Sequence, residues 1–477
     1  MLRGASAAVL AIAACAGAQA QVAQPTPVPA EPVPSSAEEQ AEQAQNEDIL
    51  VTGVRANLRE AVEIERQSNT VVSVITADDA GQFADQNVAE SLQRVPGVTI
   101  QRVEGEGRTI QVRGLNSNFN QVLINGAQIG SSDPDGNRSV SLDIISSDLL
   151  SGIRVAKTLT PDTDHDSLGA QVNLLTLSGF DRDGTTARLR AEGGLAEFAN
   201  RISPRVTADF TTRLADDTLA VAVAATYFKR FIQSEEVRGN TPLNRFVNTA
   251  GRVSNTTSAG ATRFLVPGIV DQRLKINERE RMGATLQLDY RPSDAHRWTL
   301  SLIGAQLNDF DTRIQNEFEV GQTTTTAAGA GTARYTTRLE QQIFYQDSTD
   351  RVLAGNFTGR NDFGGWILSY AADYSKNKFT LPDAQRGRFA TGNNLDVGVT
   401  FDRSDARVEL FNPAVLTPTA LAFNQALIID EERTDDIWSI AGNLERSFEL
   451  GGNQASFKIG AKYRDRDKVI RRGELNG

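Results

Sequence analysis

The stretch LAVAVAATY, residues 219–227, shows most directly what this chain of 477 residues builds. Its residues alternate in the way expected of a β-strand, whose successive side chains point to opposite faces of a sheet. The same alternation recurs at residues 187–195, 206–211, 282–290, 298–304, 366–374, 438–444 and 457–463. The chain from about residue 185 onward is therefore predicted to form a sheet of long strands.

The spacing of these strands favours a membrane barrel over a soluble β-sandwich, which would also alternate. Tight links are expected at residues 215–218, 291–297, 361–365 and 449–454, and long polar links at 229–280, 307–350 and 376–436. Structureless loops of that length are rare in compact domains, whereas outer-membrane barrels combine short periplasmic turns with long outer loops. Short and long links alternate strictly along the chain.

Aromatic residues support the same reading, although ordinary core aromatics remain an alternative. Tyr and Trp are placed at or near strand ends, where a membrane interface holds amphipathic rings. They are Tyr227, Tyr290, Trp298, Trp366, Tyr374, Trp438 and Tyr463. The expected fold is an all-β transmembrane antiparallel β-barrel of about nine strands, incomplete in this chain, with an N-terminal α+β domain. Because an open sheet edge is costly in lipid, the chain is expected to be a fragment.

The N-terminus predicts export. Residues 1–20 have the pattern of a secretory signal peptide, with Arg3, a short apolar run and a small-x-small cleavage site. Cys15 lies within this segment, and its lipidation is left open. No other cysteine and only two histidines are present, which argues against disulfides, thiol catalysis and His-rich metal sites. The net charge of −11 and the lack of a basic stripe argue against nucleic-acid binding.

Residues 21–47 are rich in Pro, Glu, Gln and Ala and are predicted to be a disordered linker. A short β-prone segment follows, made of Asp48, Ile49, Leu50, Val51, Thr52 and Gly53. A strand-prone peptide on a flexible tether suits capture by the open sheet edge of a partner. The alternative is that it forms the first strand of the next domain.

Residues 54–180 mix helix and strand signals. Asp85 is placed to cap a short helix that ends before Pro96-Gly97. Strands are expected at residues 98–103, 109–113, 121–125 and 152–157. These elements predict a small α+β domain.

Four segments resemble the TonB-dependent outer-membrane receptors. They are EDILVTG at 47–53, DQNVAESLQRVPG at 85–97, RTIQVRGLNSNFNQVLING at 108–126, and the region 139–177 with SLDIISSDLLSGIRVAKTLTPD and GAQVNLLT. The last form resembles a subgroup from Caulobacter- and Xanthomonas-type bacteria that is often tied to carbohydrate uptake. The resemblance departs from the family pattern at Gly169-Ala170 and at Asn125, neither of which threatens it.

The resemblance implies a domain order and a mechanism. Residues 48–53 would be the TonB box, residues 54–180 a plug domain facing the periplasm, and residues 181–477 the N-terminal part of the barrel. The protein would sit in the lipid of the outer membrane and import a small solute. TonB, with its inner-membrane energising complex, would drive import by displacing the plug.

Candidate solute contacts come from two polar segments of the plug. They are Asn116, Ser117, Asn118 and Asn120, and Asp133, Asp135, Asn137 and Arg138. Short amide and hydroxyl side chains suit sugar hydroxyl groups. The alternative is local turn chemistry, because Asn, Asp and Ser favour turns anyway.

Other functions have weaker sequence support. Residues 162–166 space three carboxylates like the start of a calcium loop, but later positions do not fit, and an acidic turn is favoured. Neither a catalytic motif nor a cofactor motif is found, so we expect a non-enzyme without metal or cofactor. Arg238, Arg245, Arg252 and Arg263 keep open a receptor for ferric siderophores, cobalamin or another metal complex. A secreted β-rich adhesin is a further alternative.

Overall fold

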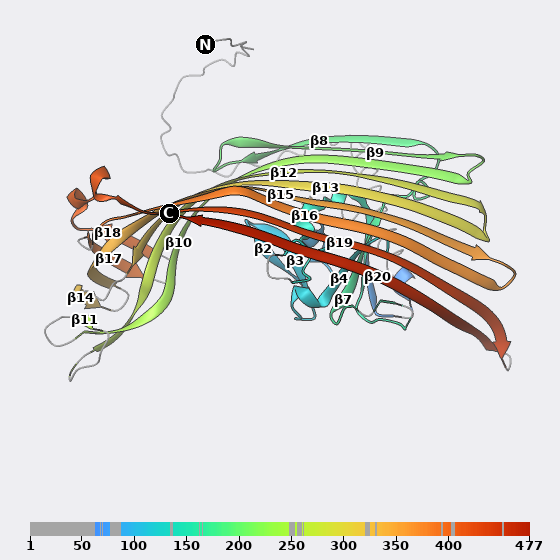
Figure 1. Cartoon of the computed structure of the whole chain (residues 1–477), viewed down its shortest axis with the longest axis horizontal. Helices are drawn as coiled ribbons and strands as arrows, with labels where there is room; N and C mark the ends of the chain where they lie inside the picture. The colour runs from blue at the N-terminus through green and yellow to red at the C-terminus, as the bar shows by residue number, and fades with distance from the viewer. Residues whose placement is uncertain are drawn as a thin grey trace, which may run out of the picture. The chain divides into compact units, whose positions relative to one another are not determined.

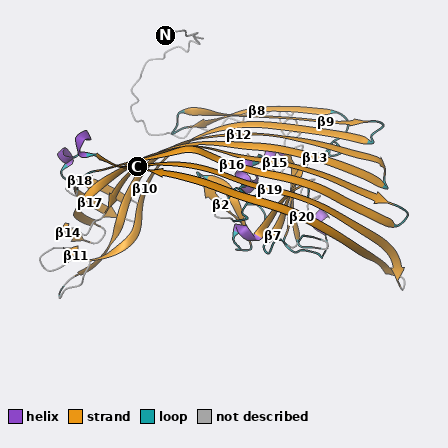
Figure 2. Ribbon diagram, viewed as in Figure 1, coloured by secondary structure: helices purple, strands orange, loops and turns teal. Residues whose placement is uncertain are grey.

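The computed structural model describes most of the chain after residue 62. The described residues are 63–66, 68, 70–76, 87–133, 137–161, 163–164, 166–247, 253–254, 260, 262–319, 325–329, 332–392, 395–401, 406–450 and 453–477. Residues 48–53, Asp85, Asp135, Asp162 and His165 lie outside them. Strand is the dominant element of the described chain (Figure 2).

A small α+β domain comes first in the chain. Its helix α3, Val88–Leu92, is capped by Asn87, whose side chain accepts a hydrogen bond from the Glu90 amide, so the cap lies two residues after the predicted Asp85. The strands are β1 (Val72–Thr76), β2 (Val98–Val103), β3 (Glu106–Val112), β4 (Asn120–Ile124), β5 (Ala127–Gln128), β6 (Leu150–Ala156) and β7 (Ala170–Thr176). Three 3₁₀ turns, η1 (Ser117–Phe119), η2 (Leu142–Ile144) and η3 (Ser147–Leu149), link them.

Five of these strands form one sheet in the order β1-β6-β7-β4-β5, in which only β4 and β7 run parallel. β2 and β3 form a separate hairpin. Its turn needs left-handed backbone at Glu104 and Gly105, as two-residue hairpin loops usually do. The hairpin and α3 pack into a core of buried apolar residues that includes Leu92, Ile110 and Leu142. The four strands expected between residues 98 and 157 are thus present.

The rest of the chain builds a large antiparallel sheet whose strands lie side by side in Figure 1. Nine strands follow the order β8-β9-β10-β12-β13-β15-β16-β19-β20. They are β8 (Thr186–Ala196), β9 (Arg201–Leu214), β10 (Leu219–Val247), β12 (Thr262–Ser293), β13 (His296–Glu319), β15 (Thr332–Asp362), β16 (Trp366–Ala390), β19 (Ala422–Leu450) and β20 (Asn453–Asn476). Each strand pairs with its neighbour in sequence, and the number of strands on this path matches the prediction.

The expectation of long polar links was wrong in one respect. Strands β10 and β12 stay paired from Leu219↔Tyr290 to Val247↔Thr262, so most of residues 229–280 is strand. The same holds for β13 with β15. Apolar residues are irregularly spaced in these extensions, so the sequence shows no sustained alternation there. The tight links, in contrast, lie where they were predicted.

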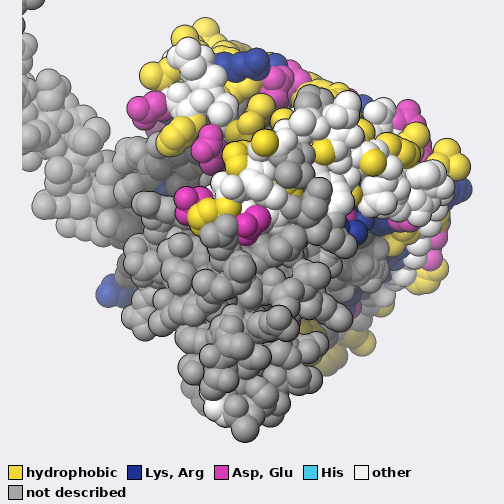
Figure 3. All heavy atoms as spheres, turned by 90° about the vertical axis from the view of Figure 1, so that its left-hand side faces the viewer, with side chains coloured by type: hydrophobic (Ala, Val, Ile, Leu, Met, Phe, Trp, Pro, Cys, Tyr) yellow, Lys and Arg dark blue, Asp and Glu magenta, His cyan; other side chains and the backbone are white. Residues whose placement is uncertain are grey.

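Shorter elements follow the far ends of the long strands. They are β11 (Val253–Ser254), β14 (Thr325–Gly329), β17 (Leu395–Phe401), β18 (Ala406–Leu410), η4 (Pro413–Val415) and η5 (Pro418–Ala420). Figure 3 looks onto this end, where apolar, acidic and basic side chains are interspersed among the described atoms. Within the described residues, no helix has the length and apolar character needed to cross a membrane.

The two faces of the large sheet differ in what they contact. On β16, Ser375 is 1% exposed and donates a hydrogen bond to the Gln128 carbonyl of the small domain at 2.7 Å, while its neighbour Tyr374 is 45% exposed on the other face. Strand alternation therefore places the small domain on one face and the aromatic residues on the opposite face.

The aromatic residues of the outer face form two rows. Tyr290 faces Trp298 across one strand pair near the tight turns. Trp366 starts β16 at the same end, and Tyr374, which faces Trp438, lies eight residues further along β16. Eight residues of strand span about 26 Å, which corresponds to about 20 Å along the axis of a barrel whose strands tilt by about 40°, compared with roughly 25 Å for the apolar band. This face has the pattern of a lipid-facing surface.

A glycine on this face tests how its aromatic residues are held. A Cβ atom on Gly359 would collide with the ring of Tyr370, whose hydroxyl oxygen accepts a hydrogen bond from the Trp298 indole at 2.7 Å. We expect Gly359→Val to displace this ring and lower the free energy of unfolding by about 1 kcal/mol or more. Urea titration of the full chain in detergent, followed by tryptophan fluorescence, measures the change.

Gly442→Val is the matched control, because nothing lies within 4 Å of a Cβ at Gly442. Equal destabilisation by the two valines would contradict the packing role of Gly359.

Candidate functional site: the interface between the small domain and the large sheet

The interface between the small domain and the large sheet is built around Glu106, the first residue of β3. Its side chain is 0% exposed. Arg230 of β10 contacts it at 2.6 Å and Arg279 of β12 at 2.5 Å, and Arg281 of β12 contacts it as well. Arginines 279 and 281 lie two residues apart on one strand, so both point to the same face. A carboxylate from one domain is thus enclosed by three guanidinium groups from the other.

A second carboxylate extends this charged cluster. Asp143, in the turn η2, accepts a hydrogen bond from Arg279 at 2.6 Å through its side chain and one from Arg281 at 2.5 Å through its backbone carbonyl. All three of these residues are buried. Burial of charges is costly unless each is paired, and here each guanidinium has at least one acceptor. We call Glu106, Asp143, Arg230, Arg279 and Arg281 the buried charge cluster.

The charge cluster controls the ionisation of Glu106. Burial alone would raise the pKa of its carboxyl group, but Arg281 and Arg279 together outweigh burial and hold the pKa at about 2, below the ordinary 4.5. The carboxylate therefore remains charged at all physiological pH values.

Other contacts fix the small domain at several points of the sheet. Asp148 of η3 is bound by Arg205 of β9 at 2.6 Å. At the opposite side, the Ser131 amide donates to Asp435 of β19 at 2.7 Å, and Ser132 donates to Asp350 of β15 at 2.6 Å. A Cβ on the neighbouring Gly130 would lie 2.7 Å from the Asp435 carbonyl, so glycine is what permits this close approach.

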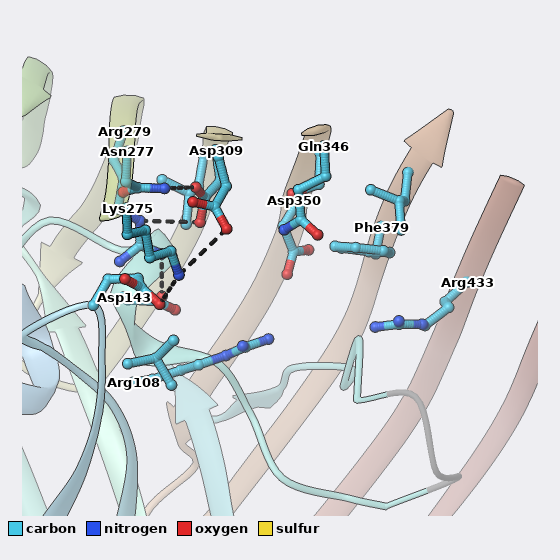
Figure 4. A pocket seen from close by; sticks show the side chains of 16 residues that line it. Arg108, Asp143, Lys275, Asn277, Arg279, Asp309, Gln346, Asp350, Phe379 and Arg433 are labelled. Carbon is cyan, nitrogen blue, oxygen red and sulfur yellow. Dashed lines mark hydrogen bonds and ion pairs between the residues drawn. The ribbon is translucent and has the colours of Figure 1, made fainter. Parts of the chain in front are cut away.

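A polar cavity of about 270 Å³ lies beside the buried charge cluster (Figure 4). The tip of the β2–β3 hairpin and Asp143 line one side, and strands β12, β13, β15, β16 and β19 line the other. Its charged lining residues are Glu104, Arg108, Asp143, Lys275, Arg279, Asp309, Asp311, Asp350 and Arg433. Five carboxylates and four cations thus surround the cavity, and Phe379 contributes an aromatic ring.

Several lining atoms lack a protein partner. One buried oxygen each of Asn277, Asp311 and Asp350 makes no hydrogen bond, and neither does one oxygen of Asp143. A buried acceptor without a partner carries a penalty of roughly 1–3 kcal/mol. The cavity therefore offers hydrogen-bond acceptors that a bound molecule or water would satisfy. In Figure 4 Arg108 and Arg433 reach toward the cavity from opposite sides.

The described candidates for solute contact from the sequence lie outside this cavity. Asn116 caps η1, Ser117 lies within that turn, and the Asn120 side chain donates to the Ile110 carbonyl at 3.0 Å. The structure joins the two predicted segments, because the side-chain amide of Asn118 donates a hydrogen bond to the side-chain oxygen of Asn137 at 3.0 Å.

The other described residues of the second segment contact β20 or a nearby loop. Lys468 of β20 donates to the carbonyls of Asp133 and Asn137, at 3.2 and 2.8 Å. Arg138 donates to the Asp166 carbonyl at 2.7 Å. None of the described candidates is among the residues that line the cavity beside Glu106.

The acidic turn near residue 164 is also bound to strand β20. Arg464 of β20 pairs with both Asp164 and Asp166, and Lys462 pairs with Asp164 at 3.1 Å. Among the described side chains, no group of His, Cys, Asp and Glu is arranged to hold a metal ion. These carboxylates fix the loop to the sheet.

Sequence reasoning missed the residues that build the buried charge cluster and the cavity beside it. Glu106, Arg279 and Asp350 stand in polar surroundings in the sequence, and nothing there distinguishes a buried charge from a solvated one. A weak signal exists in the spacing Arg279-x-Arg281, which puts two cations on one strand face.

Titration tests whether Glu106 binds the small domain to the sheet. Because its pKa in the folded protein lies below 4.5, the carboxylate adds stability that is complete above that pH and is lost as the pH falls toward about 2. Removing one partner of a buried pair costs about 3–5 kcal/mol. We expect Glu106→Gln to lower the free energy of opening of the β3 amides by that amount above pH 5. These amides should therefore exchange faster than in wild type.

Hydrogen-exchange mass spectrometry measures this free energy of opening. Its difference between wild type and Glu106→Gln should disappear as the pH approaches 2. Glu449→Gln, at an exposed position of β19, serves as the control and should match wild type throughout. A difference that stays constant from pH 6 to pH 2 would show that Glu106 does not act through its charge.

Several solved structures are similar to this chain at low identity. A variant of the ferric enterobactin receptor of Pseudomonas aeruginosa is 12% identical, with 82% of this chain and 72% of that chain covered and a TM-score of 0.38. The siderophore receptor PiuA of Acinetobacter baumannii is 14% identical, with 84% and 62% covered and a TM-score of 0.33. This chain thus spans 62–72% of the length of these two receptors.

The small domain is identified more directly. Residues 65–170 match the family model described as the TonB-dependent Receptor Plug Domain. The match contains α3, the β2–β3 hairpin with Glu106, and the turns η1–η3. Residues 65–170 are therefore similar to the plug domain of TonB-dependent receptors, and we call the small domain the plug.

Proposed function

We propose that this chain acts in the outer membrane as a TonB-coupled importer of a small solute. The observation that carries the proposal is a plug-family domain bound by buried ion pairs to one face of a nine-stranded antiparallel sheet. The opposite face carries two rows of aromatic residues. In this proposal the sheet is the wall of a barrel and the plug fills its lumen.

The proposed route of energy runs through residues 48–53. These residues, Asp48, Ile49, Leu50, Val51, Thr52 and Gly53, are proposed to be the TonB box in the periplasm. TonB would add them to a sheet edge through backbone hydrogen bonds and pull on the plug. No catalytic step, cofactor or nucleic acid forms part of this mechanism.

The proposed solute is neutral and rich in hydroxyl groups, which describes a carbohydrate. The support is the lining of the cavity beside Glu106, where five carboxylates and four cations nearly cancel. Unpartnered acceptor oxygens, arginine donors and one aromatic ring suit a molecule that carries donors, acceptors and an apolar face. The amide and hydroxyl residues of segments 116–120 and 133–138 are proposed to extend this surface outward.

A ferric siderophore, cobalamin or another metal complex is the second candidate. Arg238, Arg245, Arg252 and Arg263 keep it open. Of these, Arg238 lies beside Asp271, which also pairs with Arg273. An anionic chelate would need net positive charge, which the lining of the cavity lacks. The third candidate, a secreted adhesin, would require neither membrane insertion nor TonB.

The TonB-box proposal predicts a separation of binding from transport. Leu50→Pro removes a backbone donor and fixes φ, so strand addition should fail. We expect uptake of the solute by whole cells to be abolished while binding of the labelled solute at the cell surface is retained.

Leu50→Val is the control, because strand addition uses backbone groups and should tolerate a change of side chain. Normal uptake by the proline variant would exclude residues 48–53 as the TonB box.

The solute proposal predicts which side chains matter. A hydrogen bond to a charged group contributes about 1.5–3 kcal/mol, which corresponds to a loss of about tenfold or more in affinity. We expect Asp350→Asn and Arg433→Gln each to weaken binding of the transported sugar by that factor. Equilibrium binding of a panel of labelled oligosaccharides and ferric chelates to cells carrying each variant measures it.

Asp216→Asn, in the tight turn between β9 and β10, is the control and should bind like wild type. Selective loss of ferric chelate binding, with sugars never bound, would favour the second candidate instead.

A further inference from the structure

A second cavity lies on the opposite side of the sheet from the plug. It measures about 560 Å³ and spans strands β12, β13, β15 and β16. Met282 and Leu353, both exposed, form its apolar walls, and Gly304 forms its floor. Nothing lies within 4 Å of a Cβ built on Gly304, so the hollow exists because that position has no side chain. We call this cavity the outer groove.

Strand register sets the level of the outer groove. Gly304 pairs with Leu353, which pairs with Lys376, and Lys376 lies two residues beyond the aromatic Tyr374. Two residues of strand correspond to about 7 Å. The groove therefore begins at the aromatic row of Tyr374 and Trp438 and continues the apolar face just beyond it.

Three cations border the groove on its far side: Arg351, Lys376 and Lys378. Arg351 and Lys378 form a row with the neutral Gln306 across adjacent strands, and Lys376 lies two residues nearer the aromatic row. Lys376 pairs with Asp436 at 2.9 Å and Lys378 with Glu432 at 2.8 Å. Among the ion pairs of the described residues, none includes Arg351; its Nε donates to the neutral Gln306 side chain at 2.8 Å. The exposed guanidinium therefore keeps its charge available.

We propose that the outer groove binds a membrane lipid with an anionic headgroup. An acyl chain would lie against Met282, Gly304 and Leu353, and the headgroup would meet Arg351 and Lys378. The combination of an apolar floor, a cationic border and a position beside an aromatic row matches such a lipid in both its parts. A guanidinium binds a phosphate or carboxylate through two parallel hydrogen bonds. The inference rests on the proposed membrane location but is independent of the imported solute.

The test measures lipid binding to the full chain in a non-ionic detergent by native mass spectrometry. The probes are dioleoyl phosphatidylglycerol, which is anionic, and dioleoyl phosphatidylcholine, which has the same acyl chains and no net charge. One basic side chain near a membrane surface changes binding of an anionic lipid by about fivefold. We expect Arg351→Gln to lower the affinity for phosphatidylglycerol by that factor, and Lys378→Gln in addition to lower it further.

Two further variants separate charge from shape. Arg360→Gln removes the same charge from an exposed position of β15 near its tight turn, and should leave lipid affinity unchanged. Gly304→Leu places a side chain in the groove at a position where nothing lies within 4 Å of a Cβ, and it should weaken binding of both lipids. Equal affinity for the two lipids in wild type, or equal losses in Arg351→Gln and Arg360→Gln, would overturn the proposal. So would a dimer that Gly304→Leu abolishes, because a second copy would then occupy the groove.

The outcome is distinct from that of the import proposal. Lipid affinity is measured on purified chain without TonB, whereas the Leu50→Pro comparison reads uptake by cells. Failure of lipid binding with TonB-dependent uptake intact would overturn the lipid site alone.

Discussion

The fully buried carboxylate of Glu106 determines how the plug lies against the sheet. A carboxylate with 0% exposure is stable only where cations meet it, and Arg230, Arg279 and Arg281 supply them from two neighbouring strands. Because each strand is held in register by its neighbours, the three guanidinium groups form a rigid receptor for one side chain. The hairpin turn at Glu104-Gly105 then brings Glu106 to that receptor. The cavity beside it follows from the same arrangement, since Arg279 and Asp143 belong to both.

An interface of this kind specifies position without holding the plug irreversibly. Buried ion pairs are close to neutral in net stability when compared with apolar packing, because desolvation offsets attraction. Water that enters the interface can solvate each charge as the partners separate, whereas a purely apolar interface has no such compensation. Contacts at Asp148 and Asp435 have the same polar character. On the proposed function, this suits a plug that is displaced by force and returns to one place.

The sequence allowed prediction of the elements but little of the interface. Alternation predicts the strands with one apolar face, and tight links are present within the ranges predicted for them, residues 215–218 and 361–365. The extensions of β10 and β12 are not predicted as strands, because their apolar residues do not alternate regularly. Glu106 and its arginines were missed because their pairing joins residues more than 120 positions apart. Asn116 and Asn120 are predicted solute contacts because of their amide side chains. In the structure, both side chains make hydrogen bonds within the plug.

The period of two residues in a strand lets one segment serve both faces of the sheet. On β12, Arg281 and Gly283 face the plug, whereas Met282 between them faces outward into the outer groove. A Cβ on Gly283 would lie 2.7 Å from the Leu149 side chain, so a larger residue there would displace this leucine of the plug. Gly304 on the neighbouring strand is small for a different reason, since nothing on the plug side touches it. Contact with the plug explains the first glycine and leaves the second unexplained, which is why the hollow over Gly304 calls for a ligand on the outer face.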